Sequence, residues 1–130
     1  MNNLQFDYNS MDIHMCGKFE SRCNILSDSS GTGKTLLLST LLFYCMEQGY
    51  RVRHYDYAHP LEKVELGYDI LLLDNADLYL TQELLDSLCD LDGLIVISGH
   101  KVQYELKFPR YSKDYYCDYL NRVLNVKEFC

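Results

Sequence analysis

The segment Asp28–Thr35 constrains the fold of this chain more than any other feature of its sequence. It reads Asp-Ser-Ser-Gly-Thr-Gly-Lys-Thr and lies between a predicted strand, Phe19–Leu26, and a Leu-rich segment, Lys34–Gln48. Its two glycines permit backbone angles that other residues avoid, so that several N–H groups can point inward at an anion. The Leu-rich segment contains no Gly or Pro before Gly49, which predicts a helix whose positive end faces the same anion. We therefore expect a strand, a phosphate-binding loop and a helix in that order.

Alternating and continuous apolar runs predict the remaining elements. Leu4–Tyr8 and Met11–Met15 alternate apolar and polar residues across an Asn-Ser turn, which predicts an antiparallel hairpin at one edge of a sheet. Gly17 and Lys18 predict a second turn. Further predicted elements are strands at Arg51–Tyr57, Tyr68–Asp74, Leu94–Ser98 and Val123–Phe129, and helices at Thr81–Cys89 and Tyr115–Leu124. The pattern predicts one α/β domain over residues 1–130, with a mainly parallel sheet covered on both faces.

Composition narrows the environment and the partners. The formal net charge is −7, which disfavours nucleic acid and anionic membrane surfaces as partners. The first residues carry no secretory signal, and no apolar run reaches the roughly 20 residues of a membrane span. The six cysteines are scattered, which is typical of reduced thiols. We expect a cytoplasmic protein that does not enter a membrane.

A second acidic motif follows the phosphate loop in the sequence. Ile70–Leu73 is a continuous apolar run that ends in Asp74. A buried parallel strand of this kind places its final carboxylate at the carboxyl edge of the sheet, beside the phosphate loop. There the carboxylate can hold Mg²⁺ through water. The alternative is an Asp that only terminates a core strand.

Together the two motifs resemble the Walker A and Walker B motifs of the P-loop NTPase superfamily. One predicted strand, Arg51–Tyr57, separates them, and this order is similar to the branch that contains the AAA+ and ABC-type ATPases. The resemblance covers Leu4 to about Lys101 and implies a three-layer P-loop NTPase-like fold with an N-terminal antiparallel hairpin. It implies binding of a nucleotide with Mg²⁺. The absence of an Asn-Lys-x-Asp motif for guanine favours ATP over GTP.

The resemblance also assigns roles to individual residues. Nucleotide contacts are expected from Asp28, Ser29, Ser30, Gly31, Thr32, Gly33, Lys34, Thr35 and Leu36. Lys34 is expected on the β- and γ-phosphates, and Thr35 with Asp74 on Mg²⁺. Tyr8 is expected to stack on adenine, although a Tyr that fills the edge of the core explains it equally well. Ser98 and His100, at the end of a buried strand, are expected near the γ-phosphate; an ordinary loop His is the alternative.

Two departures from the family pattern bear on catalysis. Asp28 stands where the phosphate loop usually has Gly, and a carboxylate there repels phosphate if it points inward. Asn75 stands where a Glu usually activates water, and an amide takes no proton; Asp77 is the nearest carboxylate that could replace it. The sequence therefore predicts an ATP-binding protein with slow or partner-dependent Mg²⁺-dependent hydrolysis. The alternatives are a regulatory module that binds ATP without hydrolysis and, less favoured, a small-molecule kinase, since His59–Gly67 is short and lacks Arg.

The segment after His100 mixes basic and aromatic residues. Lys101, Lys107, Arg110 and Lys113 alternate with Tyr and Phe, whereas Asp69–Asp92 is acidic and contains no Lys or Arg. The basic segment is typical of a solvated surface loop, and stacking on single-stranded nucleic acid is the alternative. A further alternative is self-association or binding of a partner protein, in which the basic segment of one subunit faces the acidic segment of another. Arg110 could then reach the nucleotide of a neighbouring subunit.

Overall fold

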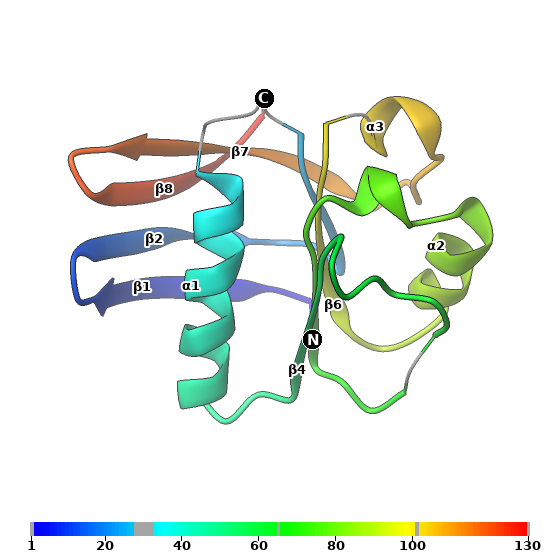
Figure 1. Cartoon of the computed structure of the whole chain (residues 1–130), viewed down its shortest axis with the longest axis horizontal. Helices are drawn as coiled ribbons and strands as arrows, with labels where there is room; N and C mark the ends of the chain where they lie inside the picture. The colour runs from blue at the N-terminus through cyan, green and yellow to red at the C-terminus, as the bar shows by residue number, and fades with distance from the viewer. Residues whose placement is uncertain (1, 28–32, 65, 101, 130) are drawn as a thin grey trace.

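An eight-stranded sheet organises the computed structural model, which describes residues 2–27, 33–64, 66–100 and 102–129 (Figure 1). The strands are β1 (Leu4–Ser10), β2 (Ile13–Phe19), β3 (Cys23–Leu26), β4 (Val52–Tyr55), β5 (Ile70–Leu73), β6 (Leu94–Ser98), β7 (Lys113–Leu120) and β8 (Val123–Glu128). The helices are α1 (Lys34–Glu47), α2 (Gln82–Cys89) and the short α3 (Val102–Glu105), with a 3₁₀ turn η1 (Ala76–Leu78).

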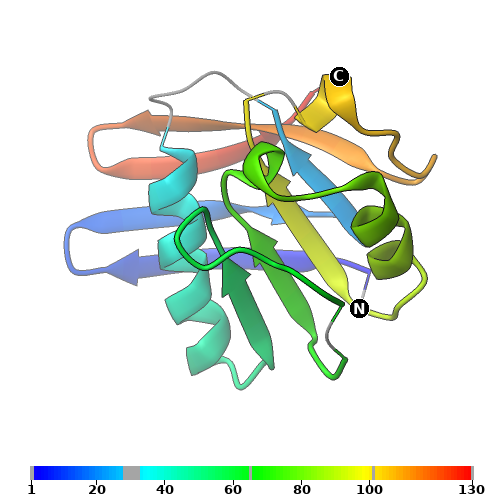
Figure 2. The same ribbon diagram turned by 45° about the vertical axis from the view of Figure 1, so that its right-hand side comes forward.

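The strands lie side by side in the order β1-β2-β8-β7-β3-β6-β5-β4. The run β7-β3-β6-β5-β4 is parallel throughout, and β2 also pairs in parallel with β8. The two sequential hairpins, β1-β2 and β7-β8, are antiparallel. The prediction of α/β content with an antiparallel N-terminal hairpin at one edge of a mostly parallel sheet is therefore confirmed. Figure 2 shows β4, β5 and β6 running side by side with β3 beyond them.

Alternation along the central strands divides the core into two apolar clusters, one on each face of the sheet. In β5, Ile70 and Leu72 pack with Leu37 and Leu41 of α1. Their neighbours on the other face, including Leu71, belong to a cluster with α2 and η1. The sheet is curled, and α1 lies on its concave side (Figures 1 and 2).

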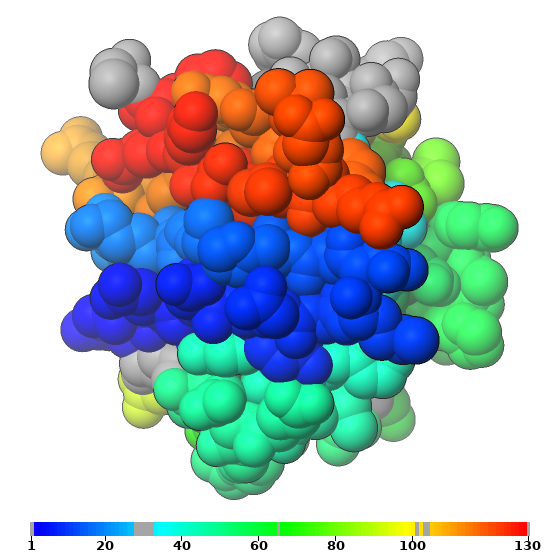
Figure 3. Space-filling model, turned by 90° about the vertical axis from the view of Figure 1, so that its left-hand side faces the viewer, coloured from blue at the N-terminus to red at the C-terminus, as the bar shows by residue number. Residues whose placement is uncertain are grey.

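Strands β1, β2, β8 and β7 form one continuous surface of the molecule (Figure 3). Polar cross-strand pairs cover it: His14 contacts the carboxylate of Asp7, and Cys16 Sγ donates to Asn125 Oδ1 at 2.7 Å. The inward residues of the same strands, such as Phe6, are buried against α1. This half of the sheet thus has one polar face and one core face, as expected for antiparallel hairpins.

Two predictions of local structure are wrong. Gly17 and Lys18 do not form a turn, because they lie inside β2 opposite Phe6 and Gln5. Tyr115–Leu124 is not a helix: it contains most of β7 and a tight turn, whose residues Asn121 and Arg122 have φ values of 52° and 64°. Two successive residues with positive φ form the kind of turn that joins antiparallel strands, and it directs the chain back into β8.

Among the described residues, no helix combines the length and apolar character that crossing a membrane requires.

Candidate functional site

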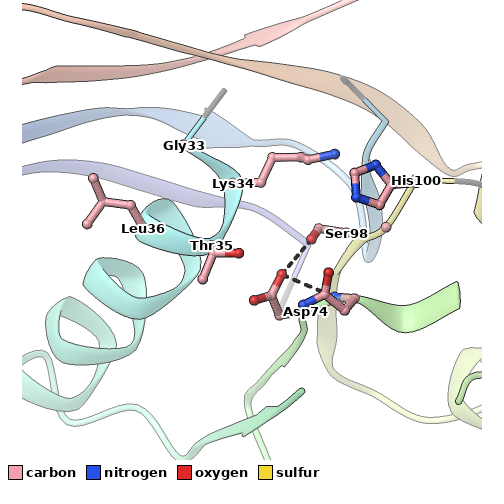
Figure 4. Close-up of a pocket in the computed structure, with 9 residues that line it drawn as sticks. Gly33, Lys34, Thr35, Leu36, Asp74, Ser98 and His100 are labelled. Carbon is pink, nitrogen blue, oxygen red and sulfur yellow. Dashed lines mark hydrogen bonds between the residues drawn. The ribbon is translucent and has the colours of Figure 1, made fainter. Parts of the chain in front are cut away.

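A cavity of about 240 Å³ lies where the start of α1 faces the carboxyl ends of β5 and β6 (Figure 4). Its described lining is Gly33, Lys34, Thr35 and Leu36 from the helix start, and Asp74, Asn75, Ser98, Gly99 and His100 from the strand ends. Because β5 and β6 are parallel neighbours, their carboxyl ends meet at the same edge of the sheet. The fold thus gathers nine of the described residues, from three separate segments, around one cavity.

Asp74 is the buried carboxylate of this site, with a relative exposure of 3%. Its Oδ1 accepts a 2.9 Å hydrogen bond from the Ser98 hydroxyl and a 3.1 Å hydrogen bond from the Asn75 backbone N–H. Its own backbone is fixed as well, since the Asp74 N–H donates to the Tyr55 carbonyl at 2.9 Å. These bonds orient the carboxylate group, and Figure 4 shows it turned toward Thr35 across the cavity.

The helix start contributes a cation and a hydroxyl. Lys34 is 8% exposed, and Figure 4 shows its ammonium extending along the cavity on the side of His100. Thr35 directs its hydroxyl toward Asp74. The N–H groups of the first turn of a helix have no partner within that helix, and the helix dipole adds positive potential at this end. Lys34, Thr35 and the start of α1 therefore form a locally positive wall opposite one buried carboxylate.

Gly33 occupies a position at which a side chain would be strained and tightly packed. Its φ of +90° lies in the left-handed region, and it is the N-cap residue of α1. A Cβ added here would lie 3.0 Å from Leu124 Cδ2 and 3.3 Å from Tyr119 Cβ. The end of the loop is therefore packed directly against the β7-β8 hairpin, which explains the requirement for glycine at this position.

The other residues expected at the strand ends also lie at the cavity. Asn75 has a left-handed backbone with φ of 51° and lines the wall beside Asp74. Ser98 is 1% exposed and bonded to Asp74, whereas His100 is exposed at the rim. The structure thus brings Lys34, Thr35 and Asp74 together with all three of these predicted residues.

Tyr8 is not among the described residues that line the cavity, and its stacking on adenine stays a prediction. Its hydroxyl donates to Glu47 Oε1 at 3.0 Å, and its ring packs edge-on against Tyr44 at a centroid distance of 5.4 Å. Both partners lie in the last turns of α1, roughly 15–20 Å along the helix from Lys34 at 1.5 Å per residue. Tyr8 therefore joins β1 to the far end of α1, as expected for a residue that fills the edge of the core.

Asp77 is not among the described residues that line the cavity. It lies in η1, where its Oδ1 is buried without a hydrogen-bond partner among the described residues. A Cβ added to Gly99 would approach this Oδ1 to 2.6 Å, so Asp77 packs behind Gly99, and Gly99 itself forms the wall. The catalytic role expected for Asp77 stays a prediction. The position of Asp77 behind Gly99 does not favour this role.

Two contributions to the site escaped sequence reasoning. Gly99 forms part of the wall, and a side chain there would collide with Asp77 and Val102. Tyr79 donates its hydroxyl proton to the Asp74 carbonyl at 2.7 Å and fixes the end of β5. Burial raises the pKa of the Tyr79 hydroxyl, so it stays a donor at neutral pH. The sequence held no signal for the role of Tyr79, because the contact depends on the path of the chain through η1.

The expected nucleotide contacts at Asp28, Ser29, Ser30, Gly31 and Thr32 lie outside the described residues.

No family model matches this chain, and neither a curated protein nor a solved structure shows significant similarity to it.

Proposed function

We propose that this protein binds ATP with Mg²⁺ at the cavity between α1 and the ends of β5 and β6. The observation that carries the proposal is the arrangement of Lys34 and Thr35, at the positive end of a helix, opposite the buried carboxylate of Asp74. A triphosphate needs a cation and backbone N–H groups, and its metal ion needs oxygen ligands. The cavity offers both within one small volume.

The residues present fit a magnesium ion by their donor chemistry. Among the described residues, no cluster of three or more His, Cys, Asp or Glu side chains could hold a metal ion by itself. Mg²⁺ in phosphate sites uses one or two protein oxygens and completes its shell with water and phosphate. The Thr35 hydroxyl and the Asp74 carboxylate are such oxygens, and the bound ion would neutralise phosphate charge. The protein groups would hold and orient the phosphates, with the Lys34 ammonium on their outer oxygens.

The order of the central strands supports the P-loop NTPase-like fold that we propose. Strand β3, which leads to the phosphate loop, is separated from β5 by β6, and β4 follows at the edge. This places the strand bearing Ser98 between the strand of the phosphate loop and the strand that ends at Asp74. The packing of α1 on one face of the sheet and of α2 on the other supports the three-layer arrangement that we propose.

Hydrolysis in the isolated chain is expected to be slow. Asn75 occupies the wall beside Asp74, and an amide can orient a water molecule without accepting its proton. A second candidate function, ATP binding without turnover, is favoured by the position of Asp77 behind Gly99. Both functions share the same binding site and differ only in the fate of the γ-phosphate.

Calorimetric titration with ATP and Mg²⁺ tests the proposal. Lys34→Ala should weaken binding by about tenfold or more, because a charge-assisted contact to phosphate is lost. Lys63→Ala is the matched control, since Lys63 is an exposed lysine beside α2 and does not line the candidate site. Absence of ATP binding by the unmodified protein, or equal affinity in both variants, would sink the proposal. Steady-state phosphate release then separates slow hydrolysis from binding alone.

A further inference from the structure

A second cavity lies at the opposite edge of the sheet, at the amino-terminal ends of β3 and β7. Its volume is about 490 Å³, and it is lined by side chains of Arg22, Arg110, Tyr111 and Lys113, among others. Strands β3 and β7 are parallel neighbours, so their first residues meet at this edge, away from the helix start that carries Lys34. This volume falls within the range of small-molecule sites.

The charge in this cavity contrasts with the rest of the molecule. The whole chain carries a net charge of −7, yet three cationic residues line this cavity. Lys113 is paired with Glu128 at 3.2 Å, whereas no carboxylate of the described residues forms an ion pair with Arg22 or Arg110. Glu20, the carboxylate in the described lining, is already paired with Lys18 at 3.3 Å. Two arginines therefore line one cavity, and neither guanidinium group forms an ion pair with a carboxylate of the described residues.

The segment that carries these groups is anchored. The Ser112 N–H donates to the Pro109 carbonyl at 3.0 Å and closes a turn that contains Arg110 and Tyr111. The buried Ser21 hydroxyl donates to the Tyr111 carbonyl at 2.6 Å, which fixes this turn to the residues that precede β3. The Tyr111 hydroxyl reaches the Cys89 carbonyl at 3.4 Å, at the end of α2.

The side chain of Arg22 is held in a defined orientation against Tyr111, which belongs to this anchored turn. Its guanidinium carbon lies 4.9 Å from the centre of the Tyr111 ring, and its Nη1 donates to the Leu91 carbonyl at 3.3 Å. A guanidinium group has five N–H donors, so stacking on a ring and one bond to a carbonyl leave most of them available. A stacked and oriented guanidinium binds carboxylate and phosphate groups with less loss of entropy than a mobile lysine.

We propose that this second cavity is a binding site for a small molecule that bears an oxyanion, either a phosphate or a carboxylate group. Arg22 and Arg110 supply the two guanidinium groups that bind the anion, and the Tyr111 ring holds the first of them in place. The proposal is independent of nucleotide binding, because it uses no residue of the cavity beside α1.

Titration of the ¹⁵N-labelled Lys34→Ala protein with inorganic phosphate, and separately with succinate, tests the site by NMR. The Lys34→Ala background removes the principal cation of the other cavity, so that phosphate binding there does not interfere. We expect saturable shifts of the amides of Arg22, Tyr111 and Lys113. A response to phosphate alone identifies a phosphorylated ligand, and a response to succinate alone identifies a carboxylate ligand.

Arg110→Gln should weaken this binding by about tenfold, since one charge-assisted contact is lost. Arg110 is exposed, so its loss leaves the fold intact, and Lys63→Gln serves as the matched control for the change of net charge. Arg22→Lys keeps the charge at its position but loses the planar group, and should also weaken binding. The proposal is overturned if neither probe gives saturable shifts at these amides, or if the shifts persist unchanged in an Arg22→Gln/Arg110→Gln double variant.

Discussion

The hydroxyl of Ser98 donates a 2.9 Å hydrogen bond to Oδ1 of Asp74, and both side chains are almost completely buried. This bond joins the ends of β6 and β5 across the floor of the candidate site. The Asn75 N–H occupies the same oxygen atom, which leaves Oδ2 as the carboxylate atom available to a metal ion. The arrangement explains how a buried carboxylate is tolerated at this position: its charge is stabilised by two donors before any ligand binds.

Ser98→Ala tests the contribution of this bond. The substitution removes a donor to a buried carboxylate, and we expect it to lower the free energy of unfolding by about 1.5–3 kcal/mol. Ser87→Ala, at an exposed position of α2, should change the free energy of unfolding by less than about 0.5 kcal/mol. Urea denaturation followed by circular dichroism measures both values. Equal stability of the two variants would show that the Ser98 bond contributes little.

Gly33 and Gly49 offer a matched pair for the packing of the loop end. Both have positive φ, at +90° and +83°, but a Cβ at Gly33 meets Leu124 and Tyr119, whereas a Cβ at Gly49 meets nothing within 4 Å. Gly49→Ala should cost only the backbone strain, about 1–2 kcal/mol. Gly33→Ala should cost about 1 kcal/mol more, because Leu124 and Tyr119 must shift to make room for the side chain. Equal losses in urea denaturation would contradict the close packing of β8 against the loop end.

The sequence predicted the central part of the fold well, because its signals are strong there. The run Ile70–Leu73 is apolar throughout since β5 is buried on both faces, and the Leu-rich segment forms α1 with its end near Gly49. The tail was harder to predict. Tyr115–Leu124 lacks strict alternation, and it forms a strand because it pairs with β3 and β8. Strand β3 is distant in sequence, and β8 follows a turn that the sequence analysis did not recognise.

The site was predictable only where residues follow directly from a motif. Lys34, Thr35 and Asp74 were expected together, because the ends of parallel strands and the start of the following helix share one edge of the sheet. The contacts of Tyr8 with the end of α1 could not be predicted, because they depend on how the sheet curls, which no local pattern encodes. For the same reason the packing of Asp77 against Gly99 became evident only in three dimensions.

Cys89 should be the more reactive thiol in a comparison with Cys45. A hydrogen bond from the Cys23 thiol lowers the pKa of Cys89 below the usual range of a cysteine, whereas burial raises the pKa of Cys45 to about 12. Because the thiolate is the nucleophile, alkylation of Cys89 by iodoacetamide should level off at a lower pH than that of an ordinary thiol near pH 8.5. Mass spectrometry of peptides after timed labelling gives both rates. A Cys89 rate that still rises steeply above pH 9 would contradict this prediction.

Asn75→Glu tests whether the missing proton acceptor limits ATP turnover. Asn75 lines the cavity next to Asp74, so a Glu at this position would place a second carboxylate where an attacking water is expected. General-base catalysis contributes roughly 10²–10⁴-fold to a rate, and we expect Asn75→Glu to raise phosphate release by about 10²-fold if the rest of the site is competent. Asp77→Asn is the companion variant: because Asp77 lies behind Gly99, its loss should leave the basal rate within about twofold. Asn75→Gln controls for side-chain length without adding a base, and should not raise the rate.

Rapid hydrolysis by the unmodified chain that Asp77→Asn abolishes would reverse the interpretation, and would make Asp77 the base despite its position. A rate that stays low in Asn75→Glu, with ATP still bound, would instead favour the function of ATP binding without turnover.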